Sequence, residues 1–225
     1  MKKLLALPIL SILLLTACGG SDETSNQAEN KVEPKAAEQK EVSNKPAEPE
    51  VKDNGSIVFT EAGQKGDVET GTLELLKIKT VNETVSIAPM QVTIKDIKVF
   101  KLTNMTDEYK TEMEAFNDNQ PIGDSVNYIQ VSYTGENTED KNIGWNSLLN
   151  AVTDKGEQID VQLNDMIYTD ADLANEYLGK VKKEYTDGFI IKDADISKIK
   201  FVWGSSFDTD TYMDITEEQQ VEYTF

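Results

Sequence analysis

Apolar and polar residues alternate along most of the chain beyond residue 55. The alternation is clearest in four runs, whose apolar members are Ile129/Val131/Tyr133, Ile159/Val161/Leu163, Ile199/Phe201/Trp203 and Val221/Tyr223/Phe225. A period of two places every second side chain on one face of a strand, so each run predicts a β-strand with one face in a core and one in water. With turn residues between most runs, the pattern predicts about nine short strands and favours a β-sandwich.

The alternation slips twice within one long apolar run. The apolar positions of that run are Val92, Ile94, Ile97, Val99, Phe100 and Leu102. A change of phase inside a strand indicates a β-bulge or a strand that changes sheets. Further along the chain, Asp154-Lys155-Gly156 separates two strand-like runs and predicts a three-residue hairpin loop with glycine in the left-handed conformation.

Two segments follow helical spacing instead. Met105, Tyr109, Met113 and Phe116 are three or four residues apart, with Thr106 as the predicted N-cap. A second stretch of the same kind has Leu173, Tyr177, Leu178 and Val181. We therefore expect one or two short helices inserted between the strands, with their apolar sides in the core.

The first residues have the parts of an export signal. Met1-Lys2-Lys3 is basic, Leu4 to Leu15 is apolar, and Leu15-Thr16-Ala17-Cys18 contains the one cysteine of the chain. The apolar run is shorter than the roughly 20 residues that cross a bilayer. The segment resembles a bacterial lipoprotein signal with its lipobox. The resemblance implies removal of residues 1–17, diacylglycerol on the Cys18 sulfur, and a further acyl chain such as palmitate on the new N-terminus. The alternative is an ordinary secretory signal followed by a free cysteine.

The chain after the signal divides into a tether and one domain. Residues 19–54 contain no aromatic residue, no Leu and no Ile, but many Glu, Lys, Ala, Ser and Pro residues. Such a composition cannot bury enough apolar surface to offset the entropy of ordering. We therefore expect residues 18–54 to be a lipid anchor with a disordered acidic tether, and residues 55–225 to be one domain.

Composition excludes several kinds of chemistry. The 225 residues include 22 Lys and 41 acidic residues but no Arg and no His, so the formal net charge is −19. Without histidine there is no Ser-His-Asp or Cys-His nucleophile pair, and one cysteine makes neither an intramolecular disulfide nor, without histidine, a zinc site. The acidic charge argues against nucleic acid as a partner. The absence of Arg suggests an AT-rich genome, such as that of a Gram-positive bacterium.

One run carries a resemblance to a known domain. The residues from Tyr128 to Thr138, YIQVSYTGENT, resemble the central strand and Asn-Thr element of an uncharacterised immunoglobulin-like domain, which follows a lipobox and stalk in Gram-positive extracellular lipoproteins. The Asp154-Lys155-Gly156 hairpin and the strand Gly188-Phe189-Ile190-Ile191 follow in that family's order. The resemblance implies an immunoglobulin-like antiparallel β-sandwich, similar in shape to a secreted mycobacterial antigen, without an assigned activity. Because this chain lacks the cysteine pair of antibody domains, we expect Trp203 in its core.

Aspartates provide the candidate metal ligands. They cluster at Asp170/Asp172, Asp193/Asp195 and Asp208/Asp210/Asp214. An EF-hand starting at Asp208 would need Gly and Glu where the chain has Met213 and Gln219, so that motif is excluded. A different calcium site at one end of the sandwich remains a candidate, with Asp208, Asp210 and Asp214 as its ligands. Turn and cap roles explain the same residues without a metal.

Trp145 raises the question of sugar binding. It lies among amides in the sequence Asn142-Ile143-Gly144-Trp145-Asn146-Ser147. An exposed indole there would stack on a sugar ring, whereas a buried one would close the end of the sandwich. We expect the buried arrangement.

The sequence thus predicts a lipid-anchored protein on the extracellular face of the cell membrane. We expect its domain to be a non-catalytic binding or interaction module without a cofactor, with another envelope protein or an extracellular molecule as its partner. The alternative is an extracellular binding protein for calcium or a small solute. A hydrolase with two carboxylates is a third class, but the 32 acidic residues of the domain make such a pair expected by chance.

Overall fold

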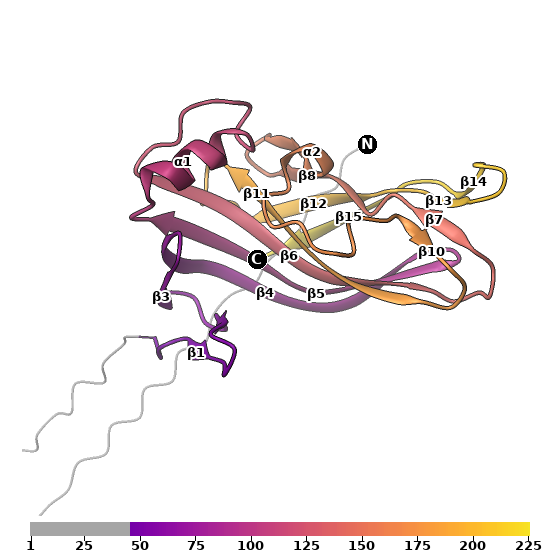
Figure 1. Cartoon of the computed structure of the whole chain (residues 1–225), viewed down its shortest axis with the longest axis horizontal. Helices are drawn as coiled ribbons and strands as arrows, with labels where there is room; N and C mark the ends of the chain where they lie inside the picture. Colours follow the sequence, from indigo (N-terminus) through magenta and orange to yellow (C-terminus); the bar gives the residue numbers. More distant parts are fainter. Residues whose placement is uncertain (1–45) are drawn as a thin grey trace, which may run out of the picture. The chain divides into compact units, whose positions relative to one another are not determined.

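The computed structural model describes residues 46–225, and these residues form a mainly β structure. The largest sheet is antiparallel and has the strand order β11-β6-β5-β4-β3. Its strands are β3 (Lys65–Val68), β4 (Gly71–Ile87), β5 (Met90–Thr103), β6 (Ser125–Asn137) and β11 (Lys182–Ile191). In Figure 1 this sheet forms the lower layer of the domain.

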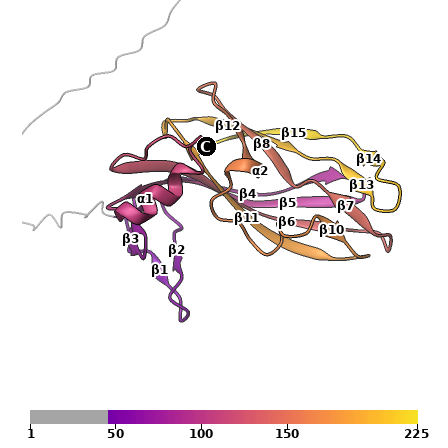
Figure 2. The same ribbon diagram turned by 45° about the horizontal axis from the view of Figure 1, so that its top comes forward.

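Two four-stranded sheets form the opposite layer. One has the order β15-β12-β8-β9 and the other the order β10-β7-β13-β14, and all their pairings are antiparallel. Their strands are β7 (Ile143–Trp145), β8 (Leu148–Thr153), β9 (Gln158–Asp160), β10 (Glu176–Tyr177), β12 (Lys198–Trp203), β13 (Ser206–Asp208), β14 (Asp214–Thr216) and β15 (Gln219–Thr224). Figure 2 shows the two layers from a second direction.

The main core lies between the layers. Val131 and Tyr133 of β6 belong to the same buried cluster as Phe201 and Trp203 of β12, and each of these side chains is fully buried. Their alternating positions follow the period of two, because only every second residue of a strand faces the other layer. The predicted mainly-β sandwich is confirmed. The immunoglobulin-like type of sandwich stays a prediction.

The two phase slips in β5 have different causes. The first is a β-bulge, because the pairing of β5 with β6 shifts between Ile94 and Asp96. At the second, Val99 and Phe100 pair with consecutive residues of β6, so the strand continues without a bulge. Val99 is in the main core, whereas Phe100 is in a second buried cluster beside α1. The slip there marks the point at which both faces of the sheet become buried.

One predicted helix is confirmed and one is wrong. Helix α1 spans Asp107–Glu114, and the Thr106 side chain accepts a hydrogen bond from the Tyr109 amide, as an N-cap does. The stretch from Leu173 to Val181 is not a helix, since it contains the short strand β10 and leaves Leu173 68 % exposed. Its apolar spacing therefore does not reflect one buried helical face.

A second short helix occurs where the sequence predicts a strand. Helix α2 spans Val161–Asn164 and begins directly after β9. Its N-cap is Asp160, whose carboxylate accepts a hydrogen bond from the Leu163 amide. Ile159 and Val161 are buried as the alternation predicts, but Leu163 is 75 % exposed because the chain has turned into a helix.

The predicted boundary at residue 54 does not coincide with a change in structure. Strands β1 (Glu50–Val51) and β2 (Ile57–Val58) form an antiparallel hairpin that spans it. The predicted signal, lipid anchor and most of the tether lie outside the described residues. The hairpin predicted at Asp154-Lys155-Gly156 is present between β8 and β9, with Gly156 at φ +80°.

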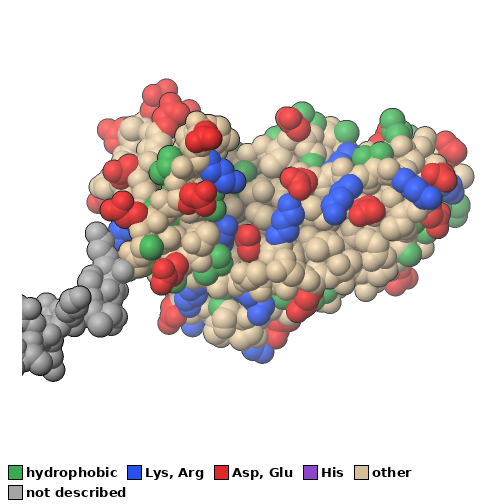
Figure 3. Space-filling view, turned by 90° about the horizontal axis from the view of Figure 1, so that it is seen from below, with side chains coloured by type: hydrophobic (Ala, Val, Ile, Leu, Met, Phe, Trp, Pro, Cys, Tyr) green, Lys and Arg blue, Asp and Glu red, His purple; other side chains and the backbone are tan. Residues whose placement is uncertain are grey.

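Charged side chains of both signs are interspersed over the face seen in Figure 3. Lysines and acidic residues also form ion pairs on the five-stranded sheet, such as Lys95–Glu184 and Lys65–Glu74. Exposed pairs of this kind contribute little to stability. Acidic groups that are buried are therefore more informative about function than the net charge.

Candidate functional site

Two acidic side chains among residues 46–225 are buried, Asp187 at 3 % exposure and Asp208 at 9 %. A buried carboxylate is costly unless hydrogen bonds or a cation compensate for its lost hydration. The surroundings of the two therefore show which of them lacks a partner.

Asp208 is compensated by its own turn and by a lysine from another segment. Its carboxylate accepts hydrogen bonds from the amides of Asp210 and Thr211 and from the Thr211 hydroxyl, and it forms an ion pair with Lys141. The Lys141 ammonium and the Thr211 donors hold the pKa of Asp208 well below its usual range. The structure thus gives Asp208 the role of a turn former.

The calcium site predicted at Asp208, Asp210 and Asp214 gains no support from this geometry. Asp214 accepts a hydrogen bond from the Ser205 hydroxyl, and Asp210 is exposed. Among the described residues, one set of three acidic side chains has its oxygens within 4.8 Å of one another, and it contains none of these three. Cation binding at this turn stays a prediction.

Asp187 is in a different situation. It lies on β11, where its neighbours of the same phase, Tyr185, Phe189 and Ile191, all belong to the main core. The sequence therefore places a carboxylate at a position that the pattern reserves for an apolar side chain. Its Oδ2 accepts a hydrogen bond of 2.9 Å from the Tyr133 hydroxyl. Its Oδ1 is buried and has no hydrogen-bond partner within residues 46–225.

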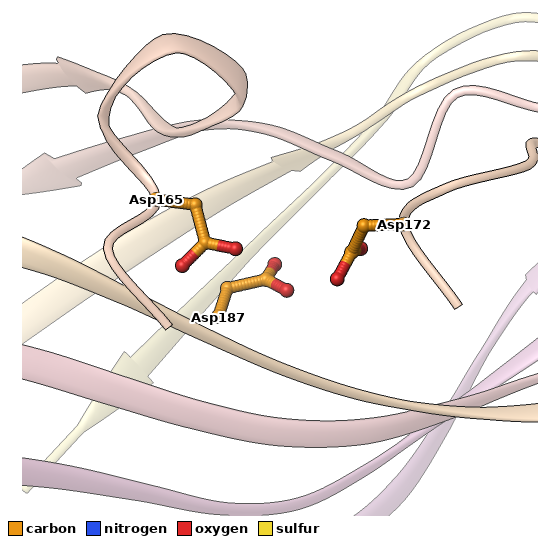
Figure 4. Close-up of side chains that lie close together, drawn as sticks. All are labelled: Asp165, Asp172 and Asp187. Carbon is orange, nitrogen blue, oxygen red and sulfur yellow. The ribbon is translucent and has the colours of Figure 1, made fainter. Parts of the chain in front are cut away.

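Two more aspartates face Asp187 from the connection between α2 and β10. Asp165 and Asp172 are partly buried, and one oxygen from each of the three carboxylates lies within 4.8 Å of the others. Figure 4 shows the three side chains pointing toward one another, Asp187 from its strand and the other two from loops. We call this set the aspartate triad.

Backbone amides hold Asp165 in place. Its Oδ1 accepts hydrogen bonds from the Gly188 amide at 2.7 Å and the Ile167 amide at 3.0 Å, and its Oδ2 accepts one from Tyr168. Glycine at position 188 lets the Ile167 side chain pack against β11, because a Cβ here would lie 2.4 Å from that side chain. The close approach of the loop to β11 is what brings Asp165 beside Asp187.

Asp172 is positioned by a turn of its own. Its Oδ2 accepts hydrogen bonds of 2.7 Å from both the amide and the hydroxyl of Thr169. These bonds use one oxygen and leave Oδ1 available. Asp172 belongs to one of the aspartate clusters that the sequence singles out, whereas Asp165 and Asp187 are not in any of them.

Burial, and to a lesser extent the neighbouring carboxylates, raises the pKa values of two members of the triad. Burial, together with the nearby charge of Asp165, raises the pKa of Asp187 well above its ordinary value. Burial also raises the pKa of Asp165, although the hydrogen bonds from Gly188 and Ile167 oppose this effect. In the described part of the chain, no lysine forms an ion pair with any member of the triad. The carboxylates of the triad therefore have no lysine partner among the described residues.

The triad lines a pocket of about 210 Å³. Its other lining residues are Ser147, Leu148, Val161, Gln162 and Tyr168. Gln162 and Tyr168 are exposed at the rim, whereas Leu148 and Val161 are buried. The pocket thus connects the buried Asp187 with the surface.

This arrangement suits a hard cation. Carboxylate oxygens are the ligands that calcium, magnesium and manganese prefer, and calcium–oxygen distances are 2.3–2.6 Å. Oxygens on opposite sides of one calcium ion are therefore about 4.6–5.2 Å apart. Three oxygens within 4.8 Å of one another fit around a single ion. Such an ion would also supply the partner that Asp187 lacks.

The indole side chains are placed as the sequence predicts. Trp145 is 1 % exposed and donates a hydrogen bond from Nε1 to the Gly204 carbonyl, so it closes the core and is not an exposed platform for a sugar. Trp203 is fully buried. Both pack against Tyr133, the residue that donates to Asp187. The triad thus lies directly beside a rigid aromatic core.

Cys18, the predicted site of lipid attachment, lies outside the described residues. In the part of the chain that the structure does describe, no helix has the length and apolar character needed to cross a membrane.

Comparison with known proteins identifies no family. No family model matches the chain, and none of the curated proteins matches it. The fold is similar to that of a functionally unknown protein from Listeria monocytogenes EGD-e, with a TM-score of 0.47 and 10 % identity over 69 % of this chain and 87 % of that one. It is also similar to a conserved hypothetical protein from Bacillus anthracis, with a TM-score of 0.37 and 16 % identity over 64 % of this chain and 96 % of that one.

Proposed function

We propose that this protein is an extracellular, lipid-anchored binding protein whose β-sandwich binds a divalent cation, with calcium as the first candidate. The ligands are the carboxylates of Asp165, Asp172 and Asp187. Cys18 carries the lipid, and residues 18–45 link it to the domain. The cation has a structural or sensing role, and the protein catalyses no reaction.

One observation carries this proposal. Asp187 is 3 % exposed and has an unpartnered oxygen at a pocket that two further carboxylates share. An acidic cluster on the surface has little meaning, because water solvates each group. A buried carboxylate without a cation partner is different, since it would cost several kcal/mol in the charged form. A bound cation would offset that cost.

The test is a comparison of thermal unfolding in EDTA and in millimolar calcium. For the full mature chain, purified from membranes in detergent, calcium at 100 times its dissociation constant would stabilise the fold by about 2.7 kcal/mol. That corresponds to a rise in unfolding temperature of roughly 5–10 °C for a domain of this size. Magnesium and manganese serve as competing ions.

Asp187→Asn is the informative variant, and Asp208→Asn is its matched control. We expect Asp187→Asn to abolish the rise in unfolding temperature with calcium, while the variant in EDTA is at least as stable as the wild type because it lacks the buried acid, whose raised pKa costs stability above pH 4. Asp208→Asn loses a turn and is less stable in both conditions, but it keeps the calcium-dependent rise. An equal rise in wild type and Asp187→Asn would contradict the proposal.

A hydrolase with paired carboxylates would use the same residues. The geometry favours a cation instead, because three backbone hydrogen bonds fix the Asp165 carboxylate and Asp187 is 3 % exposed, so a small ion reaches Asp187 through the pocket more readily than a glycan does. A general acid or base must reach the substrate proton directly or through one water molecule. Turnover of a cell-wall glycan that Asp187→Asn abolishes, without any effect of calcium on stability, would establish the hydrolase.

An interaction module for an envelope protein is a second candidate function. It is compatible with cation binding, because the two would use different surfaces of the domain. The observation that favours it is a group of exposed apolar side chains at the β13–β14 hairpin.

A further inference from the structure

The β13–β14 hairpin exposes three large apolar side chains within four residues. Tyr212 is 78 % exposed, Met213 is 70 % exposed and Ile215 is 46 % exposed. Single exposed apolar residues are common on soluble proteins, whereas a contiguous group often marks an interaction site. We call Tyr212, Met213 and Ile215 the hairpin tip.

The turn that presents the tip is tightly hydrogen-bonded. The Tyr212 amide donates to the Asp208 carbonyl at 2.8 Å, and the Asp208 amide donates to the Met213 carbonyl at 3.0 Å. The Asp208 carboxylate accepts two more hydrogen bonds from the amides of Asp210 and Thr211. The backbone that carries the apolar side chains is thus fixed before any partner arrives, which lowers the entropy cost of binding.

The backbone at the tip is strained. Tyr212 has φ +56°, in the left-handed region that residues with a Cβ rarely adopt. Strain of this kind clusters at ligand clamps and binding sites. The ring of Tyr212 stacks on Phe207, and Phe207 in turn lies against Gly144, where a Cβ would be 2.0 Å from the Phe207 ring. The stack fixes the strained residue on the sheet below it.

The position and charge of the tip indicate the kind of partner. In both ribbon views the tip lies at the opposite end of the domain from β1 and β3. The acidic residues Asp210, Asp214, Glu217 and Glu218 around it are exposed. In Figure 3, hydrophobic, acidic and lysine side chains adjoin one another at the end of the molecule that carries β14. An anionic lipid surface or a second copy of this acidic tip would be repelled.

We propose that the hairpin tip is the docking surface for a protein partner that presents an apolar pocket bordered by Lys and Arg residues. Tyr212 and Met213 enter the pocket, and the four surrounding carboxylates face the basic border. This surface is independent of the aspartate triad, so the two proposals can fail separately.

Photo-methionine provides a direct test, because Met213 is the one exposed methionine of residues 46–225. Cells that express the full chain with this analogue are irradiated, and the cross-linked product is identified by mass spectrometry. The captured protein is then purified, and its affinity for the full chain is measured. We expect one protein partner, a cross-linking yield that falls at 0.5 M NaCl, and loss of cross-linking in Met213→Leu.

Variants decide whether the tip is the contact. Tyr212→Ser should weaken binding of the purified partner at least tenfold, whereas Leu163→Ser, which changes an equally exposed leucine on α2, should leave it unchanged. Tyr212→Gly relieves the left-handed strain, so it should unfold at no lower temperature than the wild type and still lose the partner. Equal affinity of wild type and Tyr212→Ser, cross-linking only to lipid or to a second copy, or no cross-link at all would overturn the proposal.

Discussion

Asp187 combines two properties that rarely occur together in a stable domain. It has the phase of a core residue on β11, and within residues 46–225 its carboxylate has only one hydrogen-bond donor, the Tyr133 hydroxyl. Asp208 shows the usual solution, in which several donors and a lysine surround a buried carboxylate. The contrast between these two residues, within one domain, is the reason for assigning a ligand to the first and a turn to the second.

The raised pKa of Asp187 predicts how stability depends on pH without a cation. The native chain keeps a proton that the unfolded chain releases above pH 4, so the contribution of this group to stability falls as pH rises toward the native pKa. The slope is at most about 1.4 kcal/mol per pH unit. Urea unfolding in EDTA between pH 4.5 and pH 8 should show this decline in wild type, relative to Asp187→Asn.

Asp208→Asn should change the pH dependence in the opposite sense. Because the native pKa of Asp208 is depressed, its stabilising effect is present above the unfolded pKa and is lost as pH falls through the native value. The same series of unfolding curves, extended below pH 4, measures this effect. If both variants changed the slope in the same direction, the assignment of an uncompensated charge to Asp187 would be wrong.

Among the elements, the contact between β11 and the loop after α2 decides the geometry of the triad. Because Gly188 has no side chain, the loop lies so close to β11 that the Gly188 amide donates a hydrogen bond to Asp165. The Ile167 side chain occupies the space that a Cβ of residue 188 would need. Small changes at this contact therefore move Asp165 relative to Asp187, although neither aspartate is altered.

Gly188→Ala should weaken calcium binding more than it weakens the fold. The added methyl group displaces Ile167 and with it the amides that orient Asp165, and loss of such supporting contacts typically costs 10–100-fold in metal affinity. Calcium titration by calorimetry measures the effect. Gly123→Ala is the matched control, because no described atom lies within 4 Å of the Cβ it would add. Unchanged affinity in Gly188→Ala would argue against Asp165 as a ligand.

At the level of secondary structure, alternation predicted about nine short strands, whereas residues 46–225 contain fifteen, and it did not predict what the chain does between β9 and β10. Ile159 and Val161 are both buried, as the alternation predicts. The strand nevertheless ends at Asp160, which is the N-cap of helix α2. A period of two over three residues does not distinguish a continuing strand from a strand that turns into a helix. The strand ends here because the pairing of β9 with β8 stops at Asp160.

For the whole molecule, the predicted lipid anchor determines where the domain works. Cys18→Ala should release the protein into the medium or leave the precursor uncleaved, because the acyl chains provide the membrane affinity. Fractionation of cells and immunoblotting measure the distribution. The unfolding temperature of the domain and its response to calcium should not change. A processed variant that stays membrane-bound would contradict the lipobox.

The sequence by itself determined the local and compositional properties of this protein. Alternation of apolar residues in β6 and β12 predicted a sandwich, because the pleat of a strand converts sequence phase into a buried face. The spacing around Met113 and the Thr106 cap predicted α1, and the absence of histidine excluded several catalytic sites. The phase of Asp187 on β11 was also visible in the sequence and could have identified it as a core carboxylate.

The tertiary structure alone decided which carboxylates meet. Asp165 and Asp172 come from one connection and Asp187 from a strand, and their convergence depends on packing at Gly188 that no spacing records. It also decided that Asp208 has sufficient partners, since Lys141 lies 67 positions earlier in the chain. Sequence patterns describe contacts between near neighbours, whereas this site results from contacts between segments that only the folded chain brings together.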